Sequence, residues 1–256
     1  MSPLEILVLA ASAAAAGFIN SIAGGGTLLT FPAQLFFGTP PVMANATSTV
    51  SLVIGTAGSI VAFRQHFAAI KPWLYRFVPV SVLGGWIGSV LLTRTTDHVF
   101  SHLVPFLILF ATVLFFLQSM FRRWISQAAA SHKSQWFAII FQFAVSIYGG
   151  YFGAGIGILM LATFGFLGLS DIHQMNALKN LVGSIINIVA ALWFITAGIV
   201  NWPKAGVMTI GALAGYYSGA HISQRISQAA VRRVITSIGF IISAVMFYRQ
   251  FVLRPQ

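Results

Sequence analysis

Uncharged apolar runs of about 20 residues follow one another along almost the whole chain. A helix rises about 1.5 Å per residue, so each such run can cross the roughly 30 Å hydrocarbon layer of a bilayer. Charged residues make up 7% of the 256 residues, whereas a soluble domain carries about 25%. We therefore predict an all-α polytopic membrane protein.

The residue types of the chain exclude several other classes of protein, because some residues those classes need are missing and others do not have the required spacing. There is no cysteine, which excludes thiol chemistry and cysteine-bound metals. The six histidines show no metal-ligand spacing, so we expect no metal and no cofactor. The stretch 215–221, "GYYSGAH", carries Tyr216 where intramembrane serine proteases need glycine. We expect a protein that is not an enzyme.

The net charge of +11 has a membrane explanation. Basic residues in loops bind the anionic lipid of the cytoplasmic leaflet, so we expect membrane lipid and no nucleic acid as a partner. The N-terminal apolar run carries Glu5 and lacks a basic segment before it, so we expect it to remain in the protein. Together these features predict a multi-pass protein of the bacterial inner membrane.

Polar residues, glycine and proline interrupt the apolar sequence and divide the chain into ten apolar segments. The predicted segments are 4–22, 27–37, 42–63, 72–93, 98–120, 135–152, 157–168, 172–196, 204–221 and 231–250. A polar linker at 121–134 separates an N-terminal repeat, 1–120, from a C-terminal repeat, 135–256. The segment 27–37 is only about 16 Å long as a helix and reaches halfway across the membrane.

The two halves share one pattern, which indicates an internal duplication. At a shift of 131 residues, one glycine motif falls on the other: Ala23, Gly24, Gly26 and Leu28 meet Ala154, Gly155, Gly157 and Leu159. The same shift aligns Asn45 with Asn176. At a shift of 130, a stripe of small residues recurs: Ser81, Gly85 and Ser89 meet Gly211, Gly215 and Gly219. Such stripes let membrane helices approach closely.

Two topologies fit this repeat. Either 4–37 is a single broken crossing and the halves run parallel, or the short helix turns back and the halves are inverted. Both arrangements divide the lysines and arginines other than Lys179 nine to four, so their number does not decide. The inverted one places the three central basic loops in the cytoplasm and both termini in the periplasm, with Glu5 and Asp97 outside. We favour the inverted repeat, with a glycine-broken helix hairpin and three transmembrane helices in each half.

The glycine breaks predict an anion site. A break in a membrane helix is tolerated where it is buried in protein or lines a polar cavity. The short helices after the breaks begin at Thr27 and near Gly157, and their first N–H groups carry the positive end of the helix dipole. Two such ends at the midplane form an anion site. We expect Gly26 to adopt a positive φ and to approach the ligand closely.

Lys179 is the one basic side chain placed well inside a segment, and its partner is predicted to be the substrate anion. Its counterpart in the first half is Ser48. Asparagines and threonines near the same depth add uncharged hydrogen-bonding groups. The predicted substrate-binding residues are Asn20, Gly24, Gly25, Gly26, Thr27, Asn45, Thr47, Ser48, Gly153, Gly155, Gly157, Asn176, Lys179 and Asn180.

At these motifs the sequence resembles the sulfite exporter TauE/SafE family of membrane transporters. The resemblance is carried by "GFINSIAGGGTLLTFPAQLFFGTPPVMANATS", by "YGGYFGAGIGILMLATFGFLGLSDIHQMNALKN" and by the later "GIVNWPKAG". It implies a permease of small anions, with sulfite and organosulfonates as the substrates named for the family. Some relatives place a basic residue where this chain has Ser48 and Thr49.

Three hypotheses follow. The first is export of a small sulfur-containing oxyanion by alternating access, in which the repeats rock around a midplane site. The second is an uptake permease for another small organic anion at the same site. The third is a non-transporting membrane assembly protein whose glycines serve packing alone. Each of the three hypotheses is compatible with a homodimer.

Overall fold

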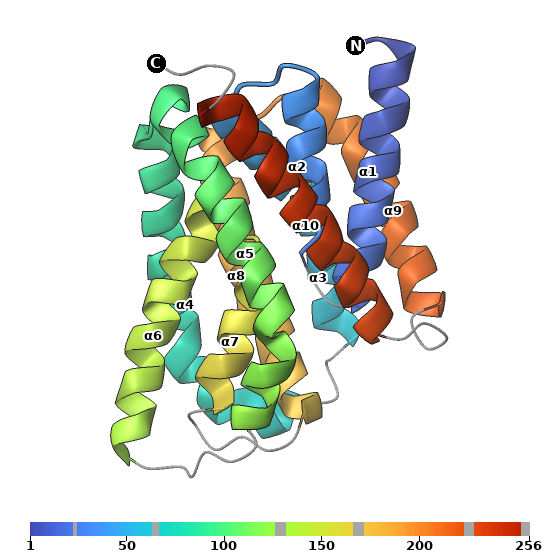
Figure 1. The fold of residues 1–256 in the computed structure, drawn as a ribbon. Helices are drawn as coiled ribbons and strands as arrows, with labels where there is room; N and C mark the ends of the chain where they lie inside the picture. The colour runs from blue at the N-terminus through green and yellow to red at the C-terminus, as the bar shows by residue number, and fades with distance from the viewer. Residues whose placement is uncertain (23–24, 63–66, 126–131, 166–171, 223–227, 252–256) are drawn as a thin grey trace.

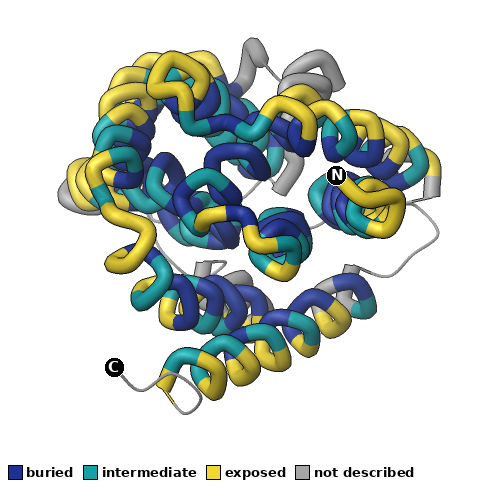
Figure 2. The backbone as a smooth tube through the Cα atoms, turned by 90° about the horizontal axis from the view of Figure 1, so that it is seen from above, coloured by how far each residue is buried: buried dark blue, intermediate teal, exposed yellow. Residues whose placement is uncertain are grey.

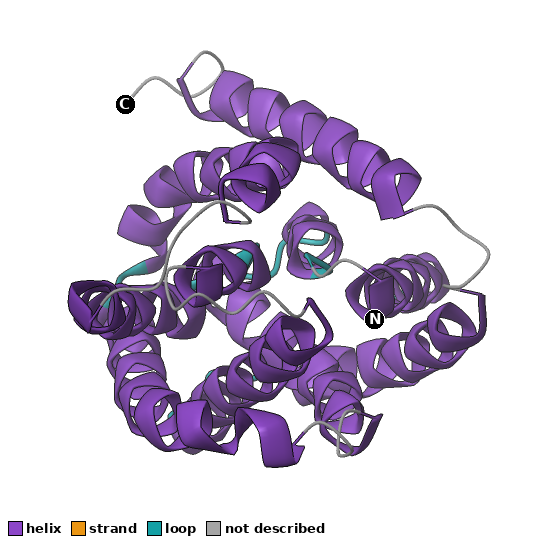
Figure 3. Cartoon of the chain, turned by 90° about the horizontal axis from the view of Figure 1, so that it is seen from below, coloured by secondary structure: helices purple, strands orange, loops and turns teal. Residues whose placement is uncertain are grey.

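A computed structural model describes residues 1–22, 25–62, 67–125, 132–165, 172–222 and 228–251 of the chain. The described residues are all helical apart from short turns and links, with no strand among them (Figure 3). The helices are α1 (Pro3–Ile22), α2 (Thr27–Phe36), α3 (Pro41–Ala62), α4 (Phe67–Arg94), α5 (Asp97–Ile125), α6 (His132–Tyr151), α7 (Ile156–Gly165), α8 (Ile172–Thr196), α9 (Trp202–Ile222) and α10 (Gln228–Phe251).

Each predicted apolar segment is a helix of the structure. The main differences lie at the polar ends, where helices continue beyond the apolar run. Helix α5 extends to Ile125 and α6 begins at His132, so both enter the range predicted as a linker. Residues 121–125 and 132–134 contain neither glycine nor proline, so no residue of these two stretches stops a helix. Hydropathy located the membrane part of each helix and not its full length.

Five of the described helices are long and apolar enough to cross a membrane. The spans are Pro3–Ser21, Ile70–Arg94, Asp97–Leu117, Gln174–Thr196 and Arg233–Phe251. Exposed residues lie on the outside of the bundle and buried residues toward its interior (Figure 2), and the exposed residues include many large apolar ones. This is the burial pattern of a protein whose surroundings are lipid, because exposed apolar side chains cost nothing there.

The start of α1 and the end of α10 lie at one end of the bundle, which we call the terminal end (Figure 1). Contacts between the first turns of helices show which other helices begin at the terminal end. Lys204, in the first turn of α9, pairs with Glu5 in the first turn of α1. The backbone N–H of Val42, at the start of α3, donates to Asp97 Oδ1 at the start of α5. Helices α1, α3, α5 and α9 therefore all begin at the terminal end.

Two helix pairs pack with their backbones almost in contact. In the pair α1–α9, a Cβ at Gly211 or Gly215 would overlap the carbonyl oxygen of Ala10 or Ala14. In the pair α4–α6, a Cβ at Gly88 would overlap the carbonyl oxygen of Ile147. Small residues bring membrane helices together in this way. The predicted stripe on α9 has this role, whereas on α4 the closest contacts involve Gly84 and Gly88 as well as the predicted Gly85.

Candidate functional site

The first helix break, between α1 and α2, is held by an asparagine of α1. The Asn20 Oδ1 atom accepts a hydrogen bond of 2.7 Å from the Gly26 N–H. The Asn20 Nδ2 atom donates to the Tyr216 hydroxyl of α9 at 3.0 Å. One of the N–H groups that a helix start leaves unpaired is thus satisfied inside the protein. Asn20 supports the break here, and α9 holds Asn20.

The positive φ at this break belongs to Gly25 and not to Gly26, so our expectation for Gly26 was wrong. Gly25 has a φ of 93°, whereas Gly26 has a φ of −56°. Gly26 is needed for packing instead, since a Cβ there would lie 2.7 Å from the Ala16 carbonyl oxygen and 2.8 Å from Asn20 Nδ2. The glycine run misled us because the adjacent glycine supplies the turn.

The second break, between α6 and α7, contains two glycines in the left-handed region. Gly153 has a φ of 81° and Gly155 a φ of 78°. The Tyr148 hydroxyl donates to the carbonyl oxygen of Ala154 at 2.8 Å, which satisfies one acceptor of the link. Within the described part of the chain, the N–H groups of Gly155 and Gly157 have no acceptor. These N–H groups lie at the positive end of the α7 dipole.

The Lys179 side chain of α8 lies beside this helix start. A Cβ at Gly157 would lie 3.3 Å from Lys179 Cδ and 3.9 Å from its Cε. Among the described residues, the Lys179 ammonium has neither a hydrogen bond nor an ion pair. A partly buried ammonium without a carboxylate favours an anion as its partner. The second break therefore brings together a cation and unpaired N–H groups.

Both breaks lie against the same face of α5. A Cβ at Gly25 would overlap the Phe115 ring, and a Cβ at Gly155 would lie 3.6 Å from Ala111 Cα. Ala111 and Phe115 are one turn apart near the middle of this 29-residue helix. The two short helices thus begin at the middle of the bundle. From there α2 runs into the half nearer the terminal end and α7 into the other half (Figure 1).

The predicted residues of α3 are buried and already have protein partners. Asn45 Nδ2 donates to the carbonyl oxygen of Tyr151 at 3.0 Å, just before the second break. The Thr47 hydroxyl accepts from the Asn201 N–H at 3.0 Å. The Ser48 hydroxyl accepts from Gln34 Nε2 at 2.7 Å. Of these side-chain atoms, Asn45 Oδ1 is buried without a partner among the described residues.

The remaining predicted residues divide between the two breaks. Asn176, Lys179 and Asn180 all lie on α8, and the first and last are one turn apart. Thr27 is the first residue of α2, at the other break. Gly24 lies outside the described residues. The structure brings Gly153, Gly155, Gly157 and Lys179 together, whereas Thr47 and Ser48 face other partners.

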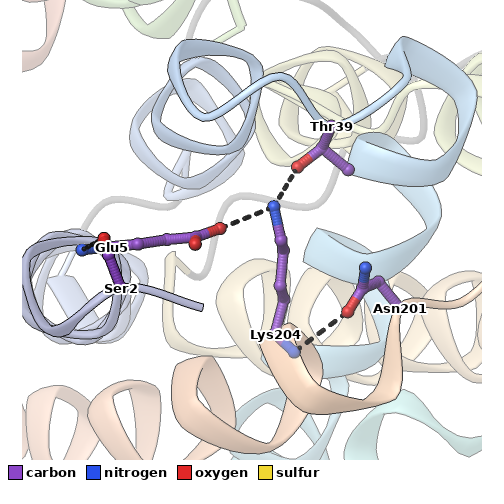
Figure 4. Close-up of polar contacts among 5 residues, drawn as sticks. All are labelled: Ser2, Glu5, Thr39, Asn201 and Lys204. Carbon is purple, nitrogen blue, oxygen red and sulfur yellow. Dashed lines mark hydrogen bonds and ion pairs between the residues drawn. The ribbon is translucent and has the colours of Figure 1, made fainter.

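The sequence analysis missed an ion pair at the terminal end. Lys204 Nζ lies 2.7 Å from Glu5 Oε1 and donates to the Thr39 hydroxyl at 2.8 Å. The Asn201 side chain accepts from the Lys204 N–H at 3.2 Å and so caps α9 (Figure 4). Glu5 and Lys204 each lie in the first turn of a helix, and the stripe on α9 could have indicated that α1 and α9 pack together.

Groups of three or more metal-ligating side chains were sought among the described residues, and none is present there. The chemistry available at the second break is therefore that of hydrogen-bond donors and one ammonium. This set can bind a small oxyanion, because N–H donors and a cation both favour negative charge.

Comparison with known proteins gives a consistent result. The family model described as "Sulfite exporter TauE/SafE" matches residues 9–246. A protein of Haemophilus influenzae named "Probable membrane transporter protein" is 28% identical over 240 residues, covering 92% of this chain and 91% of its own. The "Probable membrane transporter protein YfcA" of Escherichia coli K12 is 28% identical over 249 residues, covering 97% and 91%. No solved structure matches significantly.

Proposed function

Because this chain belongs to the sulfite exporter TauE/SafE family of membrane transporters, we propose that it exports a small sulfur-containing oxyanion such as sulfite or an organosulfonate. The observation that carries the proposal is the second break. There, unpaired N–H groups at the start of α7 lie beside the Lys179 side chain. Such a site binds a small anion and repels cations. Family membership argues against the non-transporting assembly protein.

The anion is held mainly by the second half of the chain. We assign the direct contacts to Lys179 and to the backbone of Gly155 and Gly157. Asn176 and Asn180 contribute further polar groups from α8. Asn45 lies across from them on α3, with its buried Oδ1 free to accept a hydrogen bond from a protonated anion.

We further propose that the two halves are inverted repeats, and the helix packing supports this. If α1 to α5 correspond in order to α6 to α10, the pair α1–α9 corresponds to the pair α6–α4. In the same way, the pair α4–α8 corresponds to the pair α9–α3. All four pairs are in contact. Helices α1 and α6 run in opposite directions, as do α5 and α10 (Figure 1). A two-fold axis in the membrane plane relates repeats of this kind. It leaves both termini on one side, which we assign to the periplasm of a bacterial inner membrane.

Sulfite flux into proteoliposomes tests the proposed function. The informative variant is Lys179→Met, which keeps the aliphatic stem against Gly157 and removes the charge. A hydrogen bond to a charged group contributes about 1.5–3 kcal/mol, so we expect sulfite affinity to fall about 10–100-fold. Thermal denaturation in detergent should show that the variant remains folded.

Lys71→Met is the matched control, because Lys71 is an exposed lysine on α4. It removes the same charge far from the break and should carry sulfite like the parent. Equal flux in the parent and the Lys179→Met variant would reject the site. Sulfite flux no greater in the parent than in empty liposomes would reject sulfite as the substrate.

A further inference from the structure

Among the described residues, the largest cluster of buried apolar side chains joins helices from α1 to α10 and includes Phe31, Ile108 and Phe194. Two smaller clusters each stay within a few helices and do not follow the two repeats. One cluster joins only α1, α3 and α9, with α2 packed against it, through Leu9, Ala13, Ala16, Leu52, Met208 and Ala212. Another joins only α4, α6, α7 and α8, and includes Phe77, Val145, Met160, Phe164 and Val182. We call these groups of four helices unit I (α1, α2, α3 and α9) and unit II (α4, α6, α7 and α8). Each unit takes three helices from one repeat and one from the other.

Polar contacts between helices follow the same division. In unit I, Asn20 bonds to Tyr216 and Thr47 to the Asn201 N–H. Unit I also contains the ion pair of Lys204 with Glu5 (Figure 4). In unit II, Ser146 Oγ lies 3.2 Å from Ser81 Oγ. The Trp193 indole of α8 donates to Thr93 of α4 at 3.2 Å. Each of these contacts joins a residue of the first repeat to a residue of the second within one unit.

The glycine contacts make both units rigid across the repeats. Helix α1 lies backbone to backbone on α9, and α4 on α6, so neither pair can slide without steric overlap. Each of these pairs joins a helix of the first repeat to a helix of the second. Movement of one whole repeat against the other would have to separate both pairs.

The two units meet along α3 and α8, which form the main direct helix contact between them. The side chains proposed to bind the anion lie on these two helices and at the second break. Among the described side chains, the hydrogen bond that crosses from unit I to unit II is the one from Asn45 to the Tyr151 carbonyl oxygen. Asn45 is 1% exposed, and it bonds to the residue where α6 ends.

We infer that the bodies that move during transport are units I and II and not the repeats, and that Asn45 is the positioning residue that joins unit I to the second break. This inference rests on the proposed transport function. It places the anion at the seam between two rigid bodies, where alternating access requires it. Helices α5 and α10, which pack on each other, flank the seam.

A disulfide within unit II tests the inference in a chain that has no cysteine of its own. The double variant Ser81→Cys with Ser146→Cys joins α4 of the first repeat to α6 of the second. We expect sulfite flux to be the same in its oxidised and reduced forms, with oxidation confirmed by loss of free thiols. A flux that oxidation abolishes and reduction restores would overturn the inference, because it would show that the repeats separate.

Spin-label distances give a second measurement that does not depend on flux. Leu7 of α1, Leu83 of α4 and Ile140 of α6 are exposed sites for labels. The pair Leu7→Cys with Leu83→Cys lies within one repeat but in different units, and its distance distribution in nanodiscs should be broad and should change on adding sulfite. The pair Leu83→Cys with Ile140→Cys lies within one unit but in different repeats, and its distribution should stay narrow.

The opposite result for the two label pairs would overturn the inference and favour rocking repeats. Fixed distances in both pairs would overturn it as well. A wrong substrate assignment would give a different result from a wrong assignment of the moving bodies. The cysteine-free parent would then carry no sulfite, while the widths of the two distance distributions would still report which bodies move. Asn45→Ala should broaden the distribution of the pair Leu7→Cys with Leu83→Cys further, an effect that loss of anion binding alone would not produce.

Discussion

The two glycine breaks have similar sequences but different surroundings. At the first break, the protein binds one N–H of the helix start itself: Asn20 accepts from the Gly26 N–H, and the Phe115 ring covers Gly25. At the second break, the N–H groups of Gly155 and Gly157 have no acceptor in the described part of the chain. A repeated motif therefore has a side-chain acceptor for its helix start in one half and unpaired N–H groups in the other, where we propose that the anion binds.

The short helices that follow the two breaks, α2 and α7, also differ in how many of their polar groups have protein partners. Helix α2 is held near both ends, by Asn20 at its start and by the bond from Lys204 to Thr39 just after its end. Its Gln34 also donates to Ser48 and to the Ala44 carbonyl oxygen of α3. The start of α7 lies beside a lysine whose ammonium has no partner among the described residues. This comparison predicts that changes at the first break reduce stability and changes at the second reduce transport.

The largest effect is expected for Gly26→Val. Its side chain would meet the Ala16 carbonyl oxygen and Asn20 Nδ2, which are backbone and well-held atoms of α1. Overpacking of this kind costs about 1–3 kcal/mol or more, and here the backbone must shift. We expect loss of monodisperse protein in detergent, measured by size-exclusion chromatography. A variant that purified normally but carried no sulfite would instead place the ligand at the first break.

The next effect is expected for Gly157→Ala. The added Cβ would lie 3.3 Å from Lys179 Cδ, and the long side chain can move aside. The protein should therefore fold, while the displaced ammonium binds the anion less well. Sulfite affinity should fall about tenfold, which corresponds to about 1.4 kcal/mol.

A matched control for Gly157→Ala is Gly183→Ala on α8. A Cβ at Gly183 would meet only Met160 atoms at ordinary contact distances, 3.8 Å for its Cε. This variant adds the same methyl group in the same unit and should keep both its melting temperature and its sulfite affinity. Equal affinities for the two alanine variants would contradict the assignment of the anion to the second break.

The sequence predicted the helices well because hydropathy and glycine reflect local requirements of a membrane. It also singled out Lys179, since a lone lysine within a segment needs a partner, and the Lys179 side chain lies beside Gly157. It could not predict that Asn20 caps the first break, because this depends on Tyr216, 196 residues away. It likewise assigned the positive φ to Gly26, and only the fold shows that Gly25 turns the chain and Gly26 packs against α1.

A moderate loss of stability is expected for Lys204→Met, without loss of anion affinity. The substitution removes the bonds to Glu5 and Thr39 that hold the end of α2 near α1 and α9 (Figure 4). One charge of a largely buried pair then remains without its partner, which lowers stability. Thermal denaturation measures the effect, and the double variant Glu5→Gln with Lys204→Met should recover part of it. A loss of affinity as large as that of Lys179→Met would show that Lys204 also meets the anion.

The smallest effect is expected for Asn20→Ala, and it separates the two breaks most directly. The substitution leaves the Gly26 N–H without its acceptor and frees the Tyr216 hydroxyl. Loss of a helix cap costs about 0.5–2 kcal/mol, so the melting temperature should fall by a few degrees. Tyr216→Phe removes only the outer bond of the pair and should cost less, about 0.5–1.5 kcal/mol. Both variants should bind sulfite like the parent, because we propose that the anion binds at the other break. If Asn20→Ala instead kept the parent's melting temperature and lost sulfite affinity, Asn20 would be a ligand for the anion, and the two breaks would share one function as their sequences first suggested.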